Sequence, residues 1–497
     1  MNKEHFSVPN KPFSYKLFID GEWVHAKKGK TFSRESPAHN TTVGIYEMAD
    51  AEDTELAIEA AHKALEEGPW SKMSGAERSK ILIKVADLIR ENAKELALIE
   101  TLESGKPITQ ANDEMEWAAG NWDYAATLGR HTKGESYNSL GEDMLAMTVR
   151  EPIGVVSMIT PWNFPLLIVS QKLPLALAVG CTAVIKPSEF TPGTTLKLGE
   201  LLTKAGVPSG VVNIISGYGD PVGVTMTNHP KVSMVSFTGS TKVGKLIAAS
   251  AGEKLKKVGL ELGGKNPQII FPDVNLEEVV DAVVFGVYFN MGECCNSGSR
   301  ILVHDDIADE LIQKVKEKSQ QVQTGDPLDP EVKVGPIIHS EQKDKICSYM
   351  DLATSEGAEL VLGGNSDENE AYVYPTIYDK VTPNMTIAKE EVFGPVLSII
   401  RFSTLEEAIA IANDTLYGLS ASIWTKDIDR AMVFSRKVKA GTVWVNTFMS
   451  GYAELPFGGY KESGLGREMG AYAIDEFTEL KTIQVHIGEK TNWWLNK

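Results

Sequence analysis

Residues 154–186, GVVSMITPWNFPLLIVSQKLPLALAVGCTAVIK, decide the class of fold. Two short runs rich in β-branched residues, GVVSMIT and TAVIK, flank the apolar run LLIVSQKLPLALAVG, which has the length of a helix. A strand, a helix and a second strand in this order predict a βαβ unit, whose parallel strands are buried on both faces.

The same alternation continues on the C-terminal side of this stretch. A helical pattern, PGTTLKLGELLTKAG, is followed by the strand patterns VVNIISG and VSMVSFTG. A second alternating series runs through RILVH, IADELIQKVKEKSQQV, AIAIAND and GTVWVN, whereas residues 76–105 carry apolar residues at helical spacing. The sequence therefore predicts an α/β protein with two parallel-sheet domains of similar size.

Charge and composition exclude several classes of protein. The net charge of −18 argues against nucleic-acid binding and against an anionic membrane surface. The N-terminus lacks the apolar core of a signal peptide, so we expect a cytoplasmic protein. The four cysteines, Cys181, Cys294, Cys295 and Cys347, form neither a disulfide framework nor a C-x-x-C pair, and we expect no metal site.

Two strand-like segments have no neighbour in either series. One lies in HTKGESYNSLGEDMLAMTVREPIG, residues 131–154, and the other is LKTIQVHIG, residues 480–488. Unpaired strand edges promote aggregation. We therefore expect these strands to pair with each other or with another subunit.

Two features at predicted strand ends are candidates for dinucleotide binding. In SFTGSTKVGK a strand leads through Gly239 into a helix, whose first N–H groups can bind a phosphate; a plain capped turn explains the same pattern. In VIKPSEF, Glu189 can hold ribose hydroxyls and would repel a 2′-phosphate, which favours NAD over NADP. Alone, Lys186 and Glu189 are equally consistent with a solvated loop.

The segment FNMGECCNSGSR, residues 289–300, places two cysteines side by side. Because consecutive residues of an extended segment point in opposite directions, only one thiol can face a site. Both could instead be small buried hydrophobic residues, but Gly292 and Gly298 permit the close backbone approach that a ligand needs. An unperturbed thiol has a pKa of about 8.5 and needs activation. Glu261, in GLELGGKNP, is a candidate base at the end of a strand, although an isolated carboxylate is more often a surface charge.

Seven motifs together resemble one family, the NAD(P)-dependent aldehyde dehydrogenases. LELGGKNP, the G-x-x-C-x-x-x-S-R setting of Cys295, PWNFP, KPSE, FTGSTKVG, EEVFGPV and PFGGYKESGLGRE resemble its signatures in the family's order. The similarity extends from about Phe18 to Ile487.

The resemblance implies a catalytic mechanism. Cys295 would attack the aldehyde carbon, and its backbone N–H together with Asn163 would form the oxyanion hole. Glu261 would activate the water that hydrolyses the resulting thioester, as in the hydrolytic members that do not transfer the acyl group to coenzyme A. Lys172 would assist near this base, and Cys294 would be a spectator.

The resemblance also implies the binding residues. The expected NAD contacts, with NADP as a second possibility, are Thr160, Trp162, Lys186, Ser188, Glu189, Gly219, Phe237, Gly239, Ser240, Val243, Gly263, Glu391 and Phe393. The expected substrate pocket comprises Phe164, Gln171, Asn296, Phe448 and Phe457. Because Gln171 replaces an aromatic residue of many relatives, we expect a small polar or hydroxylated aldehyde. Glu293 replaces a glutamine of several relatives and would raise the pKa of Cys295 if it pointed inward, but we expect it to face away.

The expected organisation follows the family. Residues 1–130 and 152–262 would form an NAD-binding domain and residues 263–465 a catalytic domain, both Rossmann-like, while residues 131–151 and 478–497 would serve oligomerisation as a homodimer or homotetramer. Two alternatives remain at this point: a cysteine-dependent esterase or hydrolase without redox chemistry, and a non-catalytic protein that retains the fold.

Overall fold

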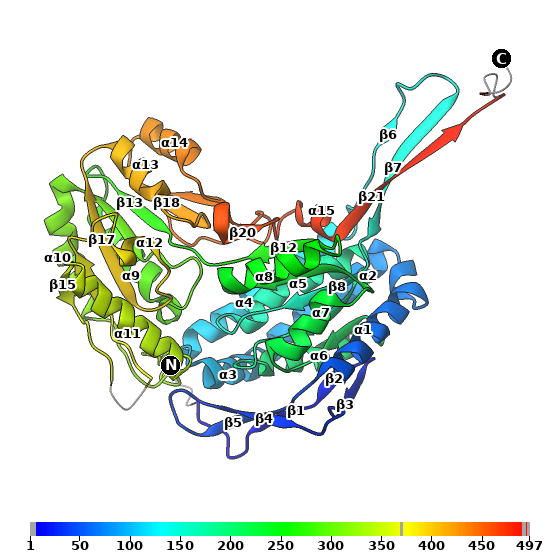
Figure 1. Ribbon diagram of the computed structural model, residues 1–497, viewed down its shortest axis with the longest axis horizontal. Coiled ribbons are helices and arrows are strands. Elements are labelled where there is room, and N and C mark those ends of the chain that lie inside the picture. The colour runs from blue at the N-terminus through cyan, green and yellow to red at the C-terminus, as the bar shows by residue number, and fades with distance from the viewer. Residues whose placement is uncertain (1–5, 368–370, 490–493, 495–497) are drawn as a thin grey trace.

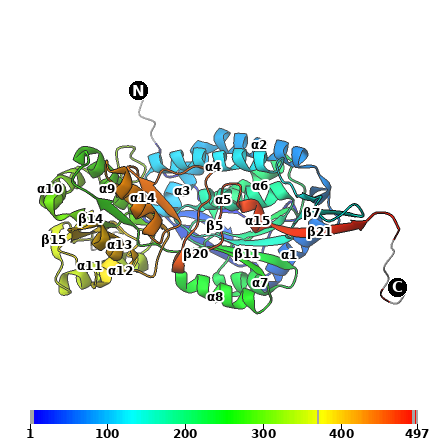
Figure 2. The ribbon, with the colours of Figure 1, turned by 90° about the horizontal axis from the view of Figure 1, so that it is seen from above.

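A computed structural model describes residues 6–367, 371–489 and 494 of the chain. It contains two large sheets in separate lobes and an arm that projects from one of them (Figures 1 and 2). Residues 1–5 and 368–370 of the expected domains, and 490–493 and 495–497 of the expected oligomerisation segment, lie outside the described residues. None of the helices in the described ranges combines the length and the hydropathy that a membrane span requires.

The first lobe is built on an eight-stranded sheet. Its strands, in spatial order, are β20 (Gly464–Leu465), β12 (Lys257–Glu261), β11 (Val232–Thr238), β8 (Val155–Ile159), β9 (Thr182–Lys186), β10 (Val212–Ile214), β2 (Leu17–Ile19) and β3 (Glu22–Val24). The five central strands from β12 to β10 run parallel. The predicted βαβ unit is confirmed: β8 pairs in parallel with β9, and α5 (Pro165–Val179) connects them.

Helices cover both faces of this sheet. They are α1 (Ala51–Glu66), α2 (Gly75–Glu91), α3 (Ala93–Ser104), α4 (Ile108–Leu128), α6 (Gly193–Ala205), α7 (Val224–Asn228) and α8 (Thr241–Gly252). The helical pattern over residues 76–105 forms two helices, because the Asn92 side chain donates to the Leu88 carbonyl and its backbone leaves the helical region. Gly105, with φ of +83°, ends the second helix as a left-handed cap.

The second lobe is built on a seven-stranded sheet. Its strands, in spatial order, are β15 (Glu359–Leu362), β16 (Thr376–Asp379), β17 (Val396–Phe402), β14 (Arg300–His304), β13 (Pro267–Ile270), β18 (Ser420–Trp424) and β19 (Thr442–Val445). Only the edge strand β15 is antiparallel to its neighbour. The main helices of this lobe are α9 (Leu276–Tyr288), α10 (Ala308–Ser319), α11 (Ser340–Ser355), α13 (Leu405–Asn413) and α14 (Ile428–Lys437). The predicted α/β class with two parallel sheets is confirmed.

Two small sheets complete the fold. One consists of β1 (Phe13–Tyr15), β5 (Thr42–Glu47) and β4 (Thr31–Glu35), beneath the first lobe. The arm contains β6 (Ser136–Tyr137), β7 (Met144–Pro152) and β21 (Thr478–His486), and β7 pairs with β21 along its whole length. Of the two pairings expected for the lone strands, with each other or with another subunit, the structure shows the first.

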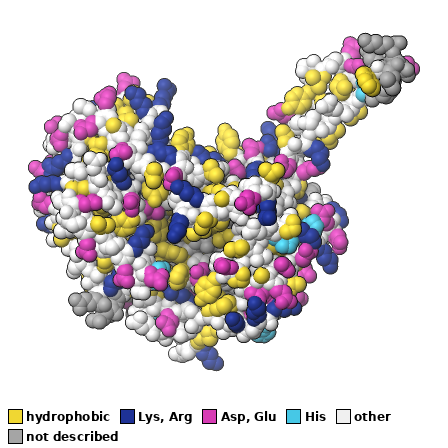
Figure 3. Space-filling view, in the orientation of Figure 1, with side chains coloured by type: hydrophobic (Ala, Val, Ile, Leu, Met, Phe, Trp, Pro, Cys, Tyr) yellow, Lys and Arg dark blue, Asp and Glu magenta, His cyan; other side chains and the backbone are white. Residues whose placement is uncertain are grey.

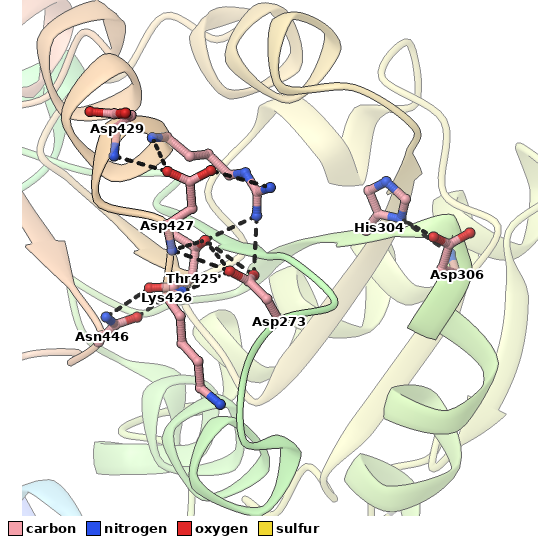
Figure 4. Close-up of polar contacts among 9 residues, drawn as sticks. Asp273, His304, Asp306, Thr425, Lys426, Asp427, Asp429 and Asn446 are labelled. Carbon is pink, nitrogen blue, oxygen red and sulfur yellow. Dashed lines mark hydrogen bonds and ion pairs between the residues drawn. The ribbon is translucent and has the colours of Figure 1, made fainter.

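A network of hydrogen bonds joins the residues that follow β13, β18 and β19 at the carboxyl edge of the second sheet (Figure 4). The Asp273 carboxylate, after β13, accepts hydrogen bonds from the Thr425 hydroxyl, the Lys426 N–H and Arg430. Asn446, after β19, both donates to and accepts from the Thr425 backbone. These groups satisfy one another and stabilise the ends of the strands, whereas the amino edge of this sheet faces the first lobe.

Candidate active site

The cysteine segment forms a strained turn between α9 and β14. Asn290, Met291 and Gly292 lie consecutively in the left-handed region, with φ of +50°, +57° and +71°. A Cβ at Gly292 would lie 2.2 Å from the Gly394 carbonyl oxygen. Only glycine therefore allows this turn to approach the loop that carries Glu391 and Phe393. Strain of this kind is concentrated at functional sites.

The two thiols have different surroundings. Cys294 is buried in a small apolar cluster with Phe164, Ile168 and Phe289. Cys295 is partly exposed. The pKa of the Cys295 thiol is raised well above 9.0 by its hydrogen bond with Cys294, by burial and by the negative charge of Glu391. The Cys294 thiol thus raises the pKa of its neighbour in addition to packing in this cluster.

Asn163 lies beside the nucleophile turn. It belongs to the segment that joins β8 to α5 and is 4% exposed. Its Nδ2 donates to the Glu293 carbonyl oxygen at 2.9 Å. One amide N–H of Asn163 is therefore fixed by the chain on which Cys295 lies, and the second N–H can serve another acceptor.

Glu261 ends β12 and is 5% exposed. Neither of its carboxylate oxygens has a hydrogen-bond partner among the described residues. Its pKa is raised well above the usual value by burial and by the charge of Glu468, and Cys295 adds to the increase. Glu261 therefore holds a proton until the pH is raised, and it interacts electrostatically with the Cys295 thiol.

Lys172 binds a partner that the sequence did not reveal. Its ammonium forms a buried ion pair with Glu468 and donates to the Ser236 hydroxyl at 3.2 Å. The positive charge of Lys172 lowers the pKa of Glu261, but its direct partner is Glu468. Glu468 is the last residue of PFGGYKESGLGRE, a motif that identified the family without assigning a role to this carboxylate.

Most residues expected to contact NAD lie at the carboxyl ends of the central strands of the first sheet. Lys186 is buried, which lowers its pKa, and its ammonium lies 3.5 Å from Glu189. Ser240 caps α8, its hydroxyl accepting from the Val243 N–H, which is typical of an anion-binding helix start. Thr160, Ser188, Gly219, Phe237 and Gly239 follow or end strands of the same edge.

The residues expected at the nicotinamide half approach this edge from the second lobe. Glu391 accepts from the Gly264 N–H at 2.9 Å, and burial raises its pKa to about 7. A Cβ at Gly263 would lie 2.3 Å from the Glu391 carboxylate. The ring of Phe393, which has φ of +58°, meets Trp162 edge-on at 5.3 Å. The structure thus brings together four of the expected contacts from two lobes, namely Trp162, Gly263, Glu391 and Phe393.

The Aldehyde dehydrogenase family model matches residues 23–483. The chain belongs to this family. It is 43% identical to the putative aldehyde dehydrogenase DhaS of Bacillus subtilis, over 95% of this chain and 96% of that one. It is 41% identical to the betaine aldehyde dehydrogenase of the same organism, over 97% of this chain and all of that one.

Solved structures of other aldehyde dehydrogenases have the same fold. The NAD-dependent aldehyde dehydrogenase from Sinorhizobium meliloti has a TM-score of 0.96 and 47% identity, with 97% of both chains covered. A point mutant of betaine aldehyde dehydrogenase from Staphylococcus aureus, in complex with NAD⁺, has a TM-score of 0.95 and 39% identity, covering 98% of this chain and all of that one.

The residues expected to line the substrate pocket of this aldehyde dehydrogenase differ in their exposure and in their contacts. Phe164, Ile168 and Gln171 follow one another at helical spacing at the start of α5, and Gln171 is partly exposed. The Asn296 Oδ1 atom is buried without a partner among the described residues. Phe457 is partly exposed, whereas Phe448 is 7% exposed and packs against Trp444.

Aromatic residues that the sequence did not single out surround this region. Phe289 stacks on Phe164 at 6.0 Å. Trp117 of α4 and Phe285 of α9 both contact the Phe289 ring and are 47% and 44% exposed. Trp117 and Phe285 were missed because they lie outside the family motifs.

Glu293 does not point toward the Cys295 thiol in the enzyme. It is 1% exposed, and its carboxyl accepts from the Ile338 N–H at 3.3 Å. Burial raises its pKa well above the usual value, while the charges of Lys106 and Arg34 lower it. The expectation that Glu293 faces away from the thiol is consistent with this position.

We predict that alkylation of Cys295 by iodoacetamide accelerates with pH and has not levelled off at pH 9, because the raised pKa keeps the thiolate scarce below it. The rate is measured by mass spectrometry of the Cys295 peptide. In Cys294→Ala, which removes the first cause of the raised pKa, the profile should move to lower pH. A plateau below pH 8 in the unchanged protein would contradict this.

Proposed function

We propose that this enzyme oxidises an aldehyde to its carboxylic acid with NAD, through a thioester on Cys295. The observation that carries the proposal is the juxtaposition of Cys295 and Glu261, which interact at the junction of the two lobes. This junction joins the carboxyl edge of one parallel sheet, where ligands of α/β proteins bind, to the nucleophile turn of the other.

The residues present fit a bound dinucleotide. The buried Thr160 and Thr238 hydroxyls have no partner among the described residues, and both lie at the edge from which Ser240 begins α8. Glu189 would hold the adenosine ribose and disfavour a 2′-phosphate, so we infer NAD rather than NADP. Glu391 and Phe393 would hold the other half. When bound, the cofactor accepts a hydride.

In the first half of the reaction, the Cys295 sulfur forms a bond to the aldehyde carbon. The oxygen of the aldehyde gains negative charge, which the Asn163 amide and the Cys295 N–H stabilise. One such donor contributes about 3–4 kcal/mol to the transition state. Since the resting thiol is protonated, its proton passes to solvent as the bond forms, because the thiol is partly exposed. Loss of a hydride from the same carbon, which the bound cofactor would accept, then leaves the thioester.

In the second half, water releases the acid. Glu261 takes a proton from the water as it attacks the thioester carbon, and the sulfur leaves with a proton. Burial raises the pKa of Glu261, and a carboxylate with a raised pKa is the stronger base. The positive charge of Lys172 opposes this increase, whereas the negative charge of its partner Glu468 adds to it.

We predict that Cys295→Ala abolishes aldehyde oxidation while NAD still binds. Glu261→Gln should give one burst of NADH and then stall, because the thioester forms but no base activates water. Stopped-flow absorbance of NADH measures both. Cys294→Ala, a thiol removal one residue away, serves as the control and should turn over. Wild-type turnover by Glu261→Gln would overturn the base assignment.

The same experiments separate the alternatives. A cysteine esterase would hydrolyse activated esters with no NADH formed from any aldehyde, whereas a non-catalytic protein would do neither. Cysteine, glutamate and asparagine lie together at the site, and this favours the enzyme.

We propose a small polar or hydroxylated aldehyde as substrate. Gln171 is a partly exposed hydrogen-bonding residue of α5, and Asn296, the residue after Cys295, has an unpartnered Oδ1. An unpaired buried acceptor favours a substrate that donates to it. The aromatic residues Phe164 and Phe289 limit the width of the approach.

We predict a higher kcat/KM for glycolaldehyde than for long-chain aldehydes, and a higher value with NAD than with NADP. Steady-state kinetics over an aldehyde series with both cofactors measures this. Gln171→Leu should reduce the preference for the hydroxylated aldehyde. A preference of the unchanged enzyme for long chains would refute the proposal.

We further propose that the arm joins subunits into a homodimer or homotetramer, in the cytoplasm. The apolar residues Ile483 and Val485, which lie on one face of β21, are 38% and 42% exposed, and hydrophobic side chains cover much of the arm (Figure 3). A short ribbon in water is only marginally stable. A second copy of the chain would cover this surface. All four cysteines are free thiols, which suits a reducing compartment.

We predict that Ile483→Asp shifts the enzyme toward smaller species in sedimentation velocity, because it places a charge in the apolar contact. Gln484→Asp adds the same charge on the opposite face of β21 and is the matched control. A monomeric unchanged enzyme, or equal effects of both variants, would count against the arm as the contact.

A further inference from the structure

Asn290 lies at the start of the nucleophile turn and is 1% exposed. Its side-chain Nδ2 donates to two carbonyl oxygens, that of Asn163 at 3.2 Å and that of Glu293 at 3.0 Å. The Glu293 carbonyl is the same oxygen that accepts from the Asn163 amide. Asn290 is therefore bonded both to the backbone of Asn163 and to the acceptor that orients the Asn163 side chain.

The backbone of Asn290 is held from the other lobe. Its N–H donates to the Gln110 Oε1 atom of α4 at 3.0 Å. The left-handed φ of +50° suits asparagine better than most residues, because its short amide tolerates this region. Any residue other than proline could donate its backbone N–H to Gln110, but only a side chain of this length with an N–H donor can join the two carbonyl groups.

We propose that Asn290 is a positioning residue for the oxyanion hole. It contacts neither the Cys295 sulfur nor Glu261 in any recorded hydrogen bond, and it acts by fixing the carbonyl groups that hold Asn163. This inference rests on the proposed role of Asn163 in aldehyde oxidation. A misplacement of about 1 Å at such a donor reduces the rate by about 100-fold.

The test compares Asn290→Gly, Asn163→Ala and the double variant. Glycine keeps the left-handed backbone without strain and removes only the amide. We expect N290G to lower kcat/KM for aldehyde oxidation and for p-nitrophenyl acetate hydrolysis in parallel, by about 10- to 100-fold, because both reactions need the oxyanion hole. The Kd for NAD and the rate of iodoacetamide alkylation, which needs no oxyanion hole, should stay within about twofold.

The double variant decides whether Asn290 acts through Asn163. We expect N163A/N290G to be no slower than N163A, since groups that act as a unit are not additive. Asn40→Gly is the matched control: Asn40 also has a left-handed φ, +47°, but is exposed and remote from the thiol, so its rate should be unchanged.

Asn290→Asp keeps the size of the side chain and replaces the donor with an acceptor facing two carbonyl oxygens. It should be at least as slow as N290G, with alkylation retained as evidence of an intact turn. Wild-type kcat/KM in N290G, a double variant slowed by the product of the two single losses, or alkylation lost in parallel with oxidation would each overturn the proposal. If N163A alone keeps wild-type activity, the oxyanion assignment fails first, and this inference fails with it.

Discussion

The close approach of backbone to backbone around the turn of Cys295 is the constraint on which the site depends. A side chain at Gly292 would collide with the Gly394 carbonyl, and one at Gly264 would lie 2.6 Å from the Cys295 carbonyl oxygen. These contacts hold the turn of Cys295 against the loop of Glu391 and against the segment that follows Glu261. An added Cβ at either glycine would push these segments apart, and the reacting groups would separate with them.

Burial in this junction sets the chemistry of the resting enzyme. The pKa values of Cys295, Glu261 and Glu391 are all raised, so the charged form of each group is disfavoured. Lys172 and Glu468 form an ion pair close to the base. A site of this kind avoids the free-energy cost of several unpaired buried charges. These groups then ionise when substrate binds and during turnover.

The two edges of the second sheet show the difference between a structural and a reactive arrangement. At the carboxyl edge, Asp273, Thr425 and Asn446 satisfy one another in a closed network. At the junction with the first lobe, Glu261 and Asn296 retain buried oxygens without partners among the described residues. Unsatisfied buried groups cost free energy, and a role in binding and catalysis explains why they are retained.

The sequence alone determined the alternating strands and helices, the pairing of the two lone strands and the motifs that indicate the family, because hydrophobic period and glycine position are local properties of a chain. It also indicated that one cysteine faces a site and that the other packs. Only the tertiary structure decided that Lys172 pairs with Glu468, that Glu293 turns toward Ile338, that Cys294 raises the pKa of Cys295, and that Asn290 joins the carbonyl groups around Asn163. Each of these contacts depends on the distance between the groups and on their burial, either between segments far apart in the chain or within a left-handed turn. The spacing of residues in the sequence encodes neither the distance nor the burial.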